Sequence, residues 1–394
     1  MTSGNLPAGL VVQAFVRSWD TGPVKMYLVA VDLTDPALAL GTMLAEGVYL
    51  SEEAQWPREP VSQLVARSGA VLGVNANFFE MNSTMNPRGM HIHSGRLVKS
   101  HNTRWNACVG FTAENKPYFG YWHWRGGIRA LDGGASVRGA AYYPTAGLNI
   151  TTIGSDDIVL YQAPWRRSLG LARREQGDED VVELVVEDQV ELEAPGALAL
   201  QAGAPGTARI VRGRVSDVRR NAPGVCPAPG QLIVSGCGKG AEALGAIRPG
   251  DQVELFYTIE GEPFGPEQPD WRTLKSVVAG NLVILKEGRY CDPRVLTLEH
   301  LHPRTVVATN KQGNELYLLV IDGRSEESVG VKYKQVADYL LSIGAWHALN
   351  LDGGGSSTLV VRDVEADTVR VVNVPCEGAE RPVPDGLGIF LRTK

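Results

Sequence analysis

Short apolar and β-branched runs, separated by Gly, Pro or Asp turns, recur along most of the chain. Runs of this length and alternation predict β-strands. The predicted strands are residues 10–16, 24–33, 70–75, 158–161, 181–192, 207–218, 251–259, 276–285, 315–321 and 358–373. Apolar residues return at helical spacing in 60–68 and 331–343, and the second segment leads into a strand over 346–351. The pattern predicts an α+β fold, with strand-rich twisted mixed sheets and a few helices.

The middle of the chain, from about residue 165 to 270, has a different character. It opens with the charged run 173–180, which is typical of a solvated hairpin tip, and continues with several short strands. We therefore predict that 165–270 forms a small β subdomain inserted into the main fold.

Composition indicates a globular protein with room for a sizeable core. The chain has 394 residues, of which 44% are hydrophobic and 21% charged. Its formal charge of −6 comes with no basic stripe, which argues against nucleic acid as the main partner. No apolar run has the length of a membrane span, and residues 1–5 lack the features of a signal peptide. The location is therefore left open between the cytoplasm and export after removal of a signal.

The segment 348–361 holds the strongest chemical signal in the chain. An apolar run ends at Asp352, three glycines and three hydroxyl residues follow, and a second apolar run begins. Successive glycines suit a chain that turns sharply or lets a ligand approach closely, and their amides form a nest for anions. The alternative is a tight hairpin whose Asp and Ser cap backbone groups. No Lys follows the glycines, so the segment is not a Walker loop.

Cysteine and histidine patterns bear on metal binding. The five cysteines lack the paired spacing of a zinc ribbon. His91 and His93 face the same way in a predicted strand, and His101 follows. Such a pair binds a metal ion, binds sugar or phosphate, or caps a strand surface, and the residues alone leave these roles open.

Several motifs, taken together, resemble the phosphodiester glycosidase family. They are Val74-Asn75-Ala76-Asn77-Phe78-Phe79, 278–288, His302-Pro303-Arg304-Thr305, Val320-Ile321-Asp322-Gly323-Arg324, 350–357 and Glu380-Arg381-Pro382-Val383. This resemblance covers nearly the whole chain, which implies one catalytic domain over 1–394. Two departures are that Ala76 and Asn77 replace the usual glycines, and that Pro384-Asp385-Gly386 replaces an Ala-Asn-Ala-like ending.

The resemblance implies a hydrolase that removes a sugar from a glycosyl-1-phosphodiester of the GlcNAc or hexose type. Such a reaction needs a carboxylate to assist attack at the anomeric carbon, and cations or amides to hold the phosphate. Asp352, Asp322 and His302 are the candidate catalytic residues. The candidate substrate-binding residues are Arg304, Thr305, Arg324, Asn75, Asn77, Asn350, Gly353, Gly354, Gly355, Ser356, Ser357 and Arg381.

Two other functions remain open on the sequence. One is an exopolysaccharide glycosidase that acts on uncharged links, and the other is a non-catalytic module that binds sugar phosphates. The expected partner is a small molecule or glycan that carries a phosphodiester, and the oligomeric state is unknown. No cofactor is required by the proposed chemistry, while a calcium or magnesium ion near the carboxylates stays open.

Overall fold

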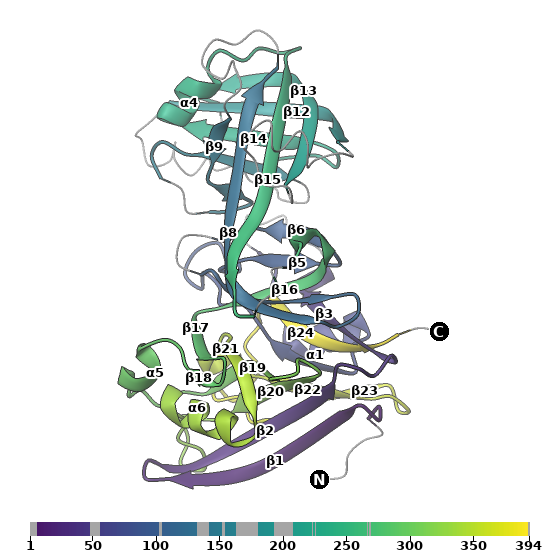
Figure 1. Cartoon of the computed structure of the whole chain (residues 1–394), viewed down its shortest axis with the longest axis vertical. Coiled ribbons are helices and arrows are strands. Elements are labelled where there is room, and N and C mark those ends of the chain that lie inside the picture. The colour runs from purple at the N-terminus through teal and green to yellow at the C-terminus, as the bar shows by residue number, and fades with distance from the viewer. Residues whose placement is uncertain are drawn as a thin grey trace.

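A computed structural model shows antiparallel β-sheets and few helices, as Figure 1 illustrates. The structure describes residues 6–47, 56–101, 105–131, 142–151, 154–162, 180–192, 208–222, 224, 226–265, 267 and 269–392. The strand-rich class predicted from the apolar pattern is confirmed. The sheets are less mixed than predicted, because among the described strand pairs only Gly147–Leu148 with Ile158–Gln162 is parallel.

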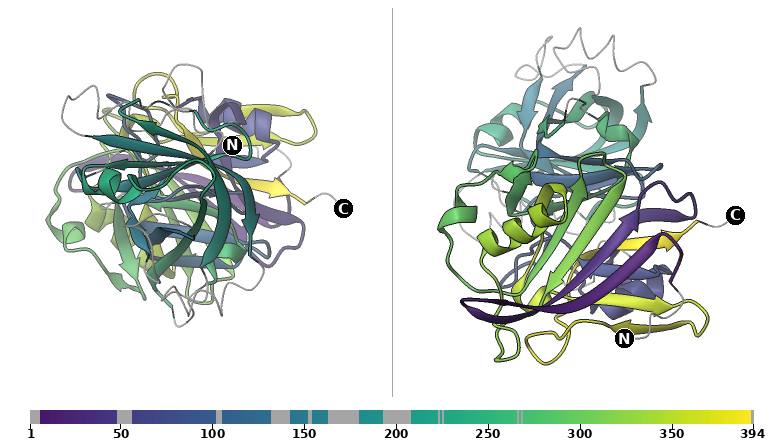
Figure 2. Two further views of the ribbon diagram at one scale, coloured as in Figure 1. Left: turned by 90° about the horizontal axis from the view of Figure 1, so that it is seen from above. Right: turned by 60° about the horizontal axis from the view of Figure 1, so that its bottom comes forward.

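A seven-stranded sheet forms the lower part of the molecule in Figure 1. Its strands, in spatial order, are β1 (Leu10–Trp19), β2 (Gly22–Asp32), β20 (Glu315–Ile321), β19 (Arg304–Asn310), β21 (Ala345–Asn350), β17 (Leu282–Lys286) and β18 (Arg289–Tyr290). Helix α6 (Tyr333–Ser342) packs Val336 and Leu340 against one face, and Figure 2 shows the helix lying across it. The helix ends before Gly344, as its pattern predicts.

A five-stranded sheet covers the opposite face of the seven-stranded one. Its order is β23 (Thr368–Val371), β22 (Leu359–Asp363), β4 (Leu72–Asn75), β24 (Asp385–Leu391) and β3 (Leu38–Leu44). Leu72, Val74 and Leu387 from this sheet share one buried cluster with Leu318 and Leu349 from the seven-stranded sheet. The two sheets therefore form a sandwich around an apolar core. Helix α1 (Val61–Ser68) packs on the outer face of the smaller sheet.

A third sheet runs from this sandwich into the upper part of Figure 1. Its order is β10 (Gly147–Leu148), β11 (Ile158–Gln162), β14 (Leu232–Cys237), β12 (Val181–Glu191), β13 (Arg209–Arg220), β15 (Gln252–Pro263), β8 (Pro117–Ala130), β7 (Ala107–Thr112), β16 (Leu274–Gly280), β5 (His91–His93) and β6 (Arg96–Lys99), with β9 (Tyr143–Thr145) beside β8. The long strands β8 and β15 pair and connect the two parts. Helix α4 (Lys239–Leu244) packs on β14 and β12 at the upper end. The described part of 165–270 lies in this upper region, and its status as an inserted subdomain stays a prediction.

Two predicted strands are each divided in the structure. Residues 276–285 form β16 and β17, which belong to different sheets, and 358–373 forms β22 and β23, which pair with each other. Gly280 lies at the first division, where an added side chain would collide with the carbonyl of Asn350. The remaining short elements are helix α5 (Arg294–Thr297) and three 3-10 turns, Ala45–Gly47, Trp271–Thr273 and Gly354–Ser356.

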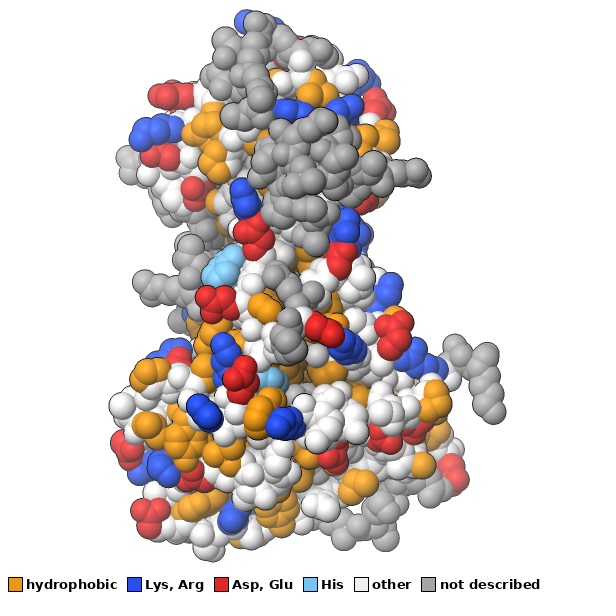
Figure 3. Space-filling model, in the orientation of Figure 1, with side chains coloured by type: hydrophobic (Ala, Val, Ile, Leu, Met, Phe, Trp, Pro, Cys, Tyr) orange, Lys and Arg blue, Asp and Glu red, His pale blue; other side chains and the backbone are white. Residues whose placement is uncertain are grey.

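The surface carries interspersed charges of both signs. On the face shown in Figure 3, basic and acidic side chains of the described residues alternate without a continuous basic stripe. Among the described helices, none combines the length and apolar character needed to cross a bilayer.

Candidate active site

The ends of four strands meet at one end of the sandwich and place most of the candidate residues there. Strands β4 and β21 end at Asn75 and Asn350, while β19 and β24 begin at Arg304 and Asp385. Beyond β21, the backbone N–H of Leu351 donates to the carbonyl of Thr305 at 2.9 Å. The segment that carries Asp352 therefore continues the pairing of β21 with β19 as it leaves the sheet.

The side chain of Asn75 holds this junction together. Its Oδ1 accepts from Thr305 Oγ1 at 2.7 Å and from the N–H of Thr358 at 3.1 Å. Its Nδ2 donates to the carbonyl of Asp352 at 2.7 Å. Asn75 and Thr305 are fully buried. The amide thus fixes both ends of the glycine turn, which is a structural contribution to the placement of Asp352.

The three glycines form a turn that lies directly against the His302–Thr305 segment. The N–H of Gly354 donates to the carbonyl of Pro303 at 2.9 Å, and Gly354 has a φ of +63°. A Cβ added at Gly353 would lie 2.8 Å from the same carbonyl, so a side chain has no room there. The glycines therefore serve the left-handed conformation and the close approach of two chain segments.

Asp352 is the buried acid of the turn, with 7% of its surface exposed. Its Oδ1 accepts from the N–H of Gly353 at 2.9 Å. Burial raises the pKa of its carboxyl to about 7, since the charged form loses hydration, while hydrogen bonds from Ser356 and Gly353 and the charge of Arg381 oppose the rise. The negative charge of Asp385 adds to it. A carboxyl with such a pKa exchanges protons near neutral pH.

Two arginines lie beside the turn. Nη1 of Arg381 donates to Ser356 Oγ at 3.5 Å, and Nε donates to Glu377 Oε2 at 3.1 Å. The guanidinium of Arg324 lies over Gly354, where an added Cβ would be 3.0 Å from its Nη2. Arg324 is exposed and also donates to Cys376 Sγ at 3.8 Å. Both predicted arginines are therefore brought to the glycine turn.

Arg304 is buried, and its charge is balanced by no carboxylate among the described residues. Its guanidinium lies 3.5 Å from the ring centroid of Tyr333, and Nε donates to the carbonyl of Val331 at 3.3 Å. Only 5% of the residue is exposed, and burial lowers its pKa. Removing a cation from water costs several kcal/mol unless an anion or good acceptors replace the hydration. Arg304 is therefore a group that an anionic ligand would stabilise.

His302 precedes Pro303, whose carbonyl accepts from the glycine turn, and the charges of nearby arginines act on it. Burial and the charges of Arg304, Arg324 and His300 lower its pKa, so the ring is neutral at physiological pH. Its buried Nδ1 has no hydrogen-bond partner among the described residues, and neither have the hydroxyls of Ser357 and Thr358. These three polar groups are available to a ligand or to water.

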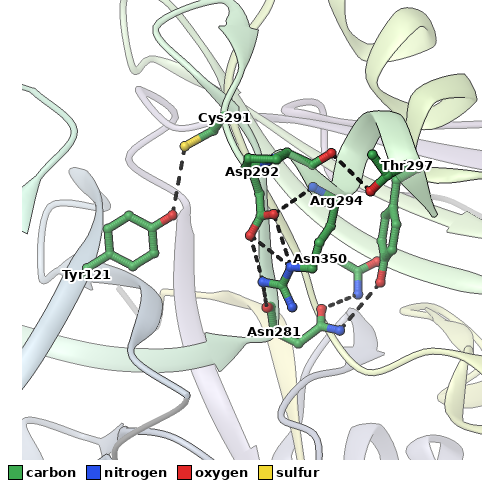
Figure 4. A network of polar contacts seen from close by, with 9 residues as sticks. Tyr121, Asn281, Cys291, Asp292, Arg294, Thr297 and Asn350 are labelled. Carbon is green, nitrogen blue, oxygen red and sulfur yellow. Dashed lines mark hydrogen bonds and ion pairs between the residues drawn. The ribbon is translucent and has the colours of Figure 1, made fainter.

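Asn350 faces away from Asp352, toward α5 and α6. Its Nδ2 donates to Asn281 Oδ1 at 2.8 Å, and Asn281 in turn donates to Tyr333 Oη at 3.4 Å. Figure 4 shows these amides beside the Asp292–Arg294 ion pair. Asn350 therefore connects the Arg304–Tyr333 pair to the base of α5.

Asp322 is held in a separate set of contacts. Its carboxylate accepts from Tyr27 Oη at 3.0 Å, from Asn373 Nδ2 at 3.0 Å and from the N–H of Val374 at 3.1 Å. Burial raises its pKa, although these hydrogen bonds oppose the rise. Asn373 links it to the turn, because Asn373 also donates to the carbonyl of Ser357 at 3.0 Å. The arrangement ties β20 to the segment before β24, and a role for Asp322 in catalysis stays a prediction.

The remaining candidate amide, Asn77, and His93 also contact protein groups. Asn77 donates to the carbonyls of Arg88 and Met90 at 3.0 and 3.2 Å, and its Oδ1 accepts from the N–H of Ala279. His93 Nδ1 lies 2.9 Å from Thr42 Oγ1. Within the described ranges, His, Cys, Asp and Glu side chains form no group of three that would hold a metal ion.

Some residues around Asp352 were not identified from the sequence. Asp385, Tyr333 and Glu377 contact or electrostatically influence the predicted site residues, and His91, which the sequence did single out, contacts Asp385. Asp385 directly precedes an apolar run, and Asp352 directly follows one. This similarity could have identified Asp385 as a candidate site residue. Two cavities among the described residues, of about 260 and 430 Å³, lie elsewhere, against His347 and His93 respectively. The candidate site is therefore identified by the polar and charged residues around Asp352, and not by either of these cavities.

Comparisons with known proteins agree with the motif pattern. Residues 206–390 match the phosphodiester glycosidase family model. An N-acetylglucosamine-1-phosphodiester alpha-N-acetylglucosaminidase from Bos taurus is 30% identical over 139 residues, which are 32% of this chain and 26% of that protein. An uncharacterized SPbeta prophage-derived protein of Bacillus subtilis is 35% identical over 88 residues, which are 22% of this chain and 13% of that protein.

A solved structure supports the fold over a longer range. The crystal structure of a hypothetical protein from Synechocystis has a TM-score of 0.72 and 17% identity, and the similarity covers 98% of this chain and 63% of that one. This likeness shows the fold, while the sequence match over residues 206–390 shows similarity to a family of glycosidases. More narrowly, the matched family is that of the phosphodiester glycosidases, in agreement with the resemblance that the motifs predict. The aligned parts span about a quarter or less of the curated relatives.

Proposed function

We propose that the chain hydrolyses a glycosyl-1-phosphodiester and releases the sugar from the phosphate. The observation that carries this proposal is a buried carboxyl, Asp352, in a glycine turn beside Arg324 and Arg381, with the unbalanced cation of Arg304 nearby. A carboxylate assists attack at an anomeric carbon, and guanidinium groups bind phosphate oxygens in pairs. The family match supports the same reaction class.

In the proposed reaction, the Asp352 carboxylate takes a proton from water as the water oxygen bonds to the anomeric carbon. The bond between that carbon and the phosphate oxygen breaks, and its electron pair leaves with the phosphate monoester. Because a phosphate monoester is a stable anion, its departure needs little proton donation. Arg304, Arg324 and Arg381 would bind the phosphate oxygens, and the hydroxyls of Ser356 and Ser357 would donate to phosphate or sugar. Asn75 and Thr305 would hold the turn in place.

A panel of α-linked sugar-1-phosphodiesters, including GlcNAc and glucose, tests the proposal through release of reducing sugar. Alkyl glycosides of the same sugars serve as uncharged controls, and parallel reactions contain a chelator. Cleavage of the phosphodiesters alone supports the proposal. Equal cleavage of the alkyl glycosides would instead indicate an exopolysaccharide glycosidase, and tight binding without turnover would indicate a sugar-phosphate binding module.

The pKa of Asp352 predicts how the rate depends on pH. A general base must be deprotonated, so kcat/KM should fall as pH drops through about 7 and level off above it. Measurement of kcat/KM between pH 5 and 9, as round limits of the titration range, checks the sign. A rate that rises toward acid pH would mean that Asp352 works in its protonated form.

Arg304→Lys tests phosphate binding by a change that keeps the charge. Lysine lacks the planar fork and the stacking on Tyr333, so kcat/KM on phosphodiesters should fall about 10-fold with little change in melting temperature. Arg214→Lys is the matched control, because Arg214 forms an exposed ion pair with Asp188 on β12. If Arg304→Lys reduced cleavage of charged and uncharged substrates equally, Arg304 would have a structural role.

A further inference from the structure

A second buried carboxyl lies behind Asp352. Asp385 is the first residue of β24 and has no exposed surface. Its Oδ1 accepts from the N–H of Asn77 at 2.8 Å. The carbonyl of that same peptide group, on Ala76, accepts from the N–H of Asp352 at 2.8 Å. One peptide group therefore bridges the backbone of the catalytic candidate and the carboxylate of Asp385.

His91 lies against the other oxygen of Asp385. Its Nδ1 is 3.0 Å from Asp385 Oδ2, and both side chains are completely buried. Because an isolated carboxylate is costly to bury, a polar neighbour this close makes the position of Asp385 tolerable. His91 also pairs across the strands with Lys99, which has 1% of its surface exposed. Asp385 therefore contacts His91, and His91 lies opposite Lys99.

We propose that Asp385, held by His91, is a positioning residue of the active site that acts on the reaction through Asp352. The proposal rests on the proposed function, in which Asp352 is the base. A negative charge nearby disfavours a second negative charge, so Asp385 makes Asp352 a stronger base than burial alone would. The hydrogen bond to Asn77 fixes where that charge lies.

The other charged groups around this pair set the size of the effect. Arg381 acts on Asp352 from the loop before β24 and opposes Asp385. His91 is itself close to His93 on β5 and opposite Lys99 on β6. Glu80 acts on Lys99, and Lys99 acts on His101. Arg381 does not contact Asp385, so a change at Asp385 leaves the Arg381–Ser356 contact in place.

Asp385→Asn is the direct test, because asparagine keeps the oxygen that accepts from Asn77 and removes the charge. The pH midpoint of kcat/KM should move to lower pH by roughly half a unit or more, since a like charge is lost. The change should appear in kcat with KM nearly unchanged, because Asp385 does not touch the substrate. Glu254→Gln is the matched control: Glu254 is equally buried and ion-paired, on β15, and its loss should leave the midpoint unmoved.

A second measurement separates this proposal from the proposed function. The Asp352 carboxyl is titrated by carbon-13 NMR, with its signal assigned by its absence in Asp352→Asn. The midpoint should be lower in Asp385→Asn than in the unmodified protein, whether or not the panel is cleaved. An unchanged or higher midpoint overturns the proposal. If Asp385→Asn does not fold, Asp385→Ser replaces it, because a hydroxyl can also accept from the N–H of Asn77 and carries no charge. The midpoint should again be lower than in the unmodified protein, and an unchanged midpoint overturns the proposal.

Discussion

Asp352→Asn should abolish turnover, with a loss of at least ~100-fold in kcat, while the protein stays folded. The change is nearly isosteric, and asparagine retains an oxygen that can accept from the N–H of Gly353. It removes the group that takes the proton, so the loss should be largest above about pH 7, where the carboxyl of the unmodified protein is deprotonated. Initial rates on the phosphodiester panel and a thermal melt of the same sample provide the measurement.

The same substitution at the second candidate acid, Asp322, provides the comparison. Asp322→Asn weakens hydrogen bonds from Tyr27, Asn373 and Val374, and each unsatisfied buried partner costs about 1–3 kcal/mol. We expect a lower melting temperature and a smaller loss of activity than in Asp352→Asn. Near-normal turnover in folded Asp352→Asn would remove Asp352 from the mechanism. A comparable loss in folded Asp322→Asn would give that residue a chemical role.

The glycine turn could be predicted from the sequence, because few backbone conformations explain three successive glycines at this position. Three glycines after an acid, between two apolar runs, are unfavourable unless the backbone needs them, and the structure shows that need at Gly353 and Gly354. The predicted strands were equally accessible, because alternation indicates burial of one face, whereas β3, β8, β14 and β24 were not among them. The helix Tyr333–Ser342 could be predicted in the same way, because its apolar residues recur at helical spacing.

Other features depend on partners that lie far away along the chain. Asp322 and Asp352 both follow an apolar strand and precede glycine, yet Tyr27 and Asn373 surround one while Ser356 and Arg381 surround the other. Nothing local distinguishes these environments. Likewise, 276–285 has the pattern of one continuous buried strand, because a change of sheet at Gly280 alters no polarity. The contact of His91 with Asp385 joins strands of two different sheets, so only the assembled fold reveals it.

Gly355→Ala should lower turnover ~100-fold with little loss of stability, by displacing Arg381. A methyl group at this position would collide with the guanidinium of Arg381 and the carboxylate of Glu377. Both are the ends of long, flexible side chains near the surface, so they can move away without disturbing the core. Arg381 would then leave Ser356 and the charge that it contributes beside Asp352. Turnover and melting temperature, measured on one sample, give the result.

Gly354→Ala is the matched comparison, and it should behave in the opposite way. Its φ of +63° is strained for alanine, so the free energy of unfolding should fall by about 1 kcal/mol or more. The nearest atom to the new methyl group would be Nη2 of Arg324, at 3.0 Å, which can shift slightly because that side chain is exposed. If Gly355→Ala melted early but cleaved normally when folded, the glycines would serve the turn alone. If instead both variants lost activity at unchanged stability, the whole turn would be a surface that the ligand approaches closely.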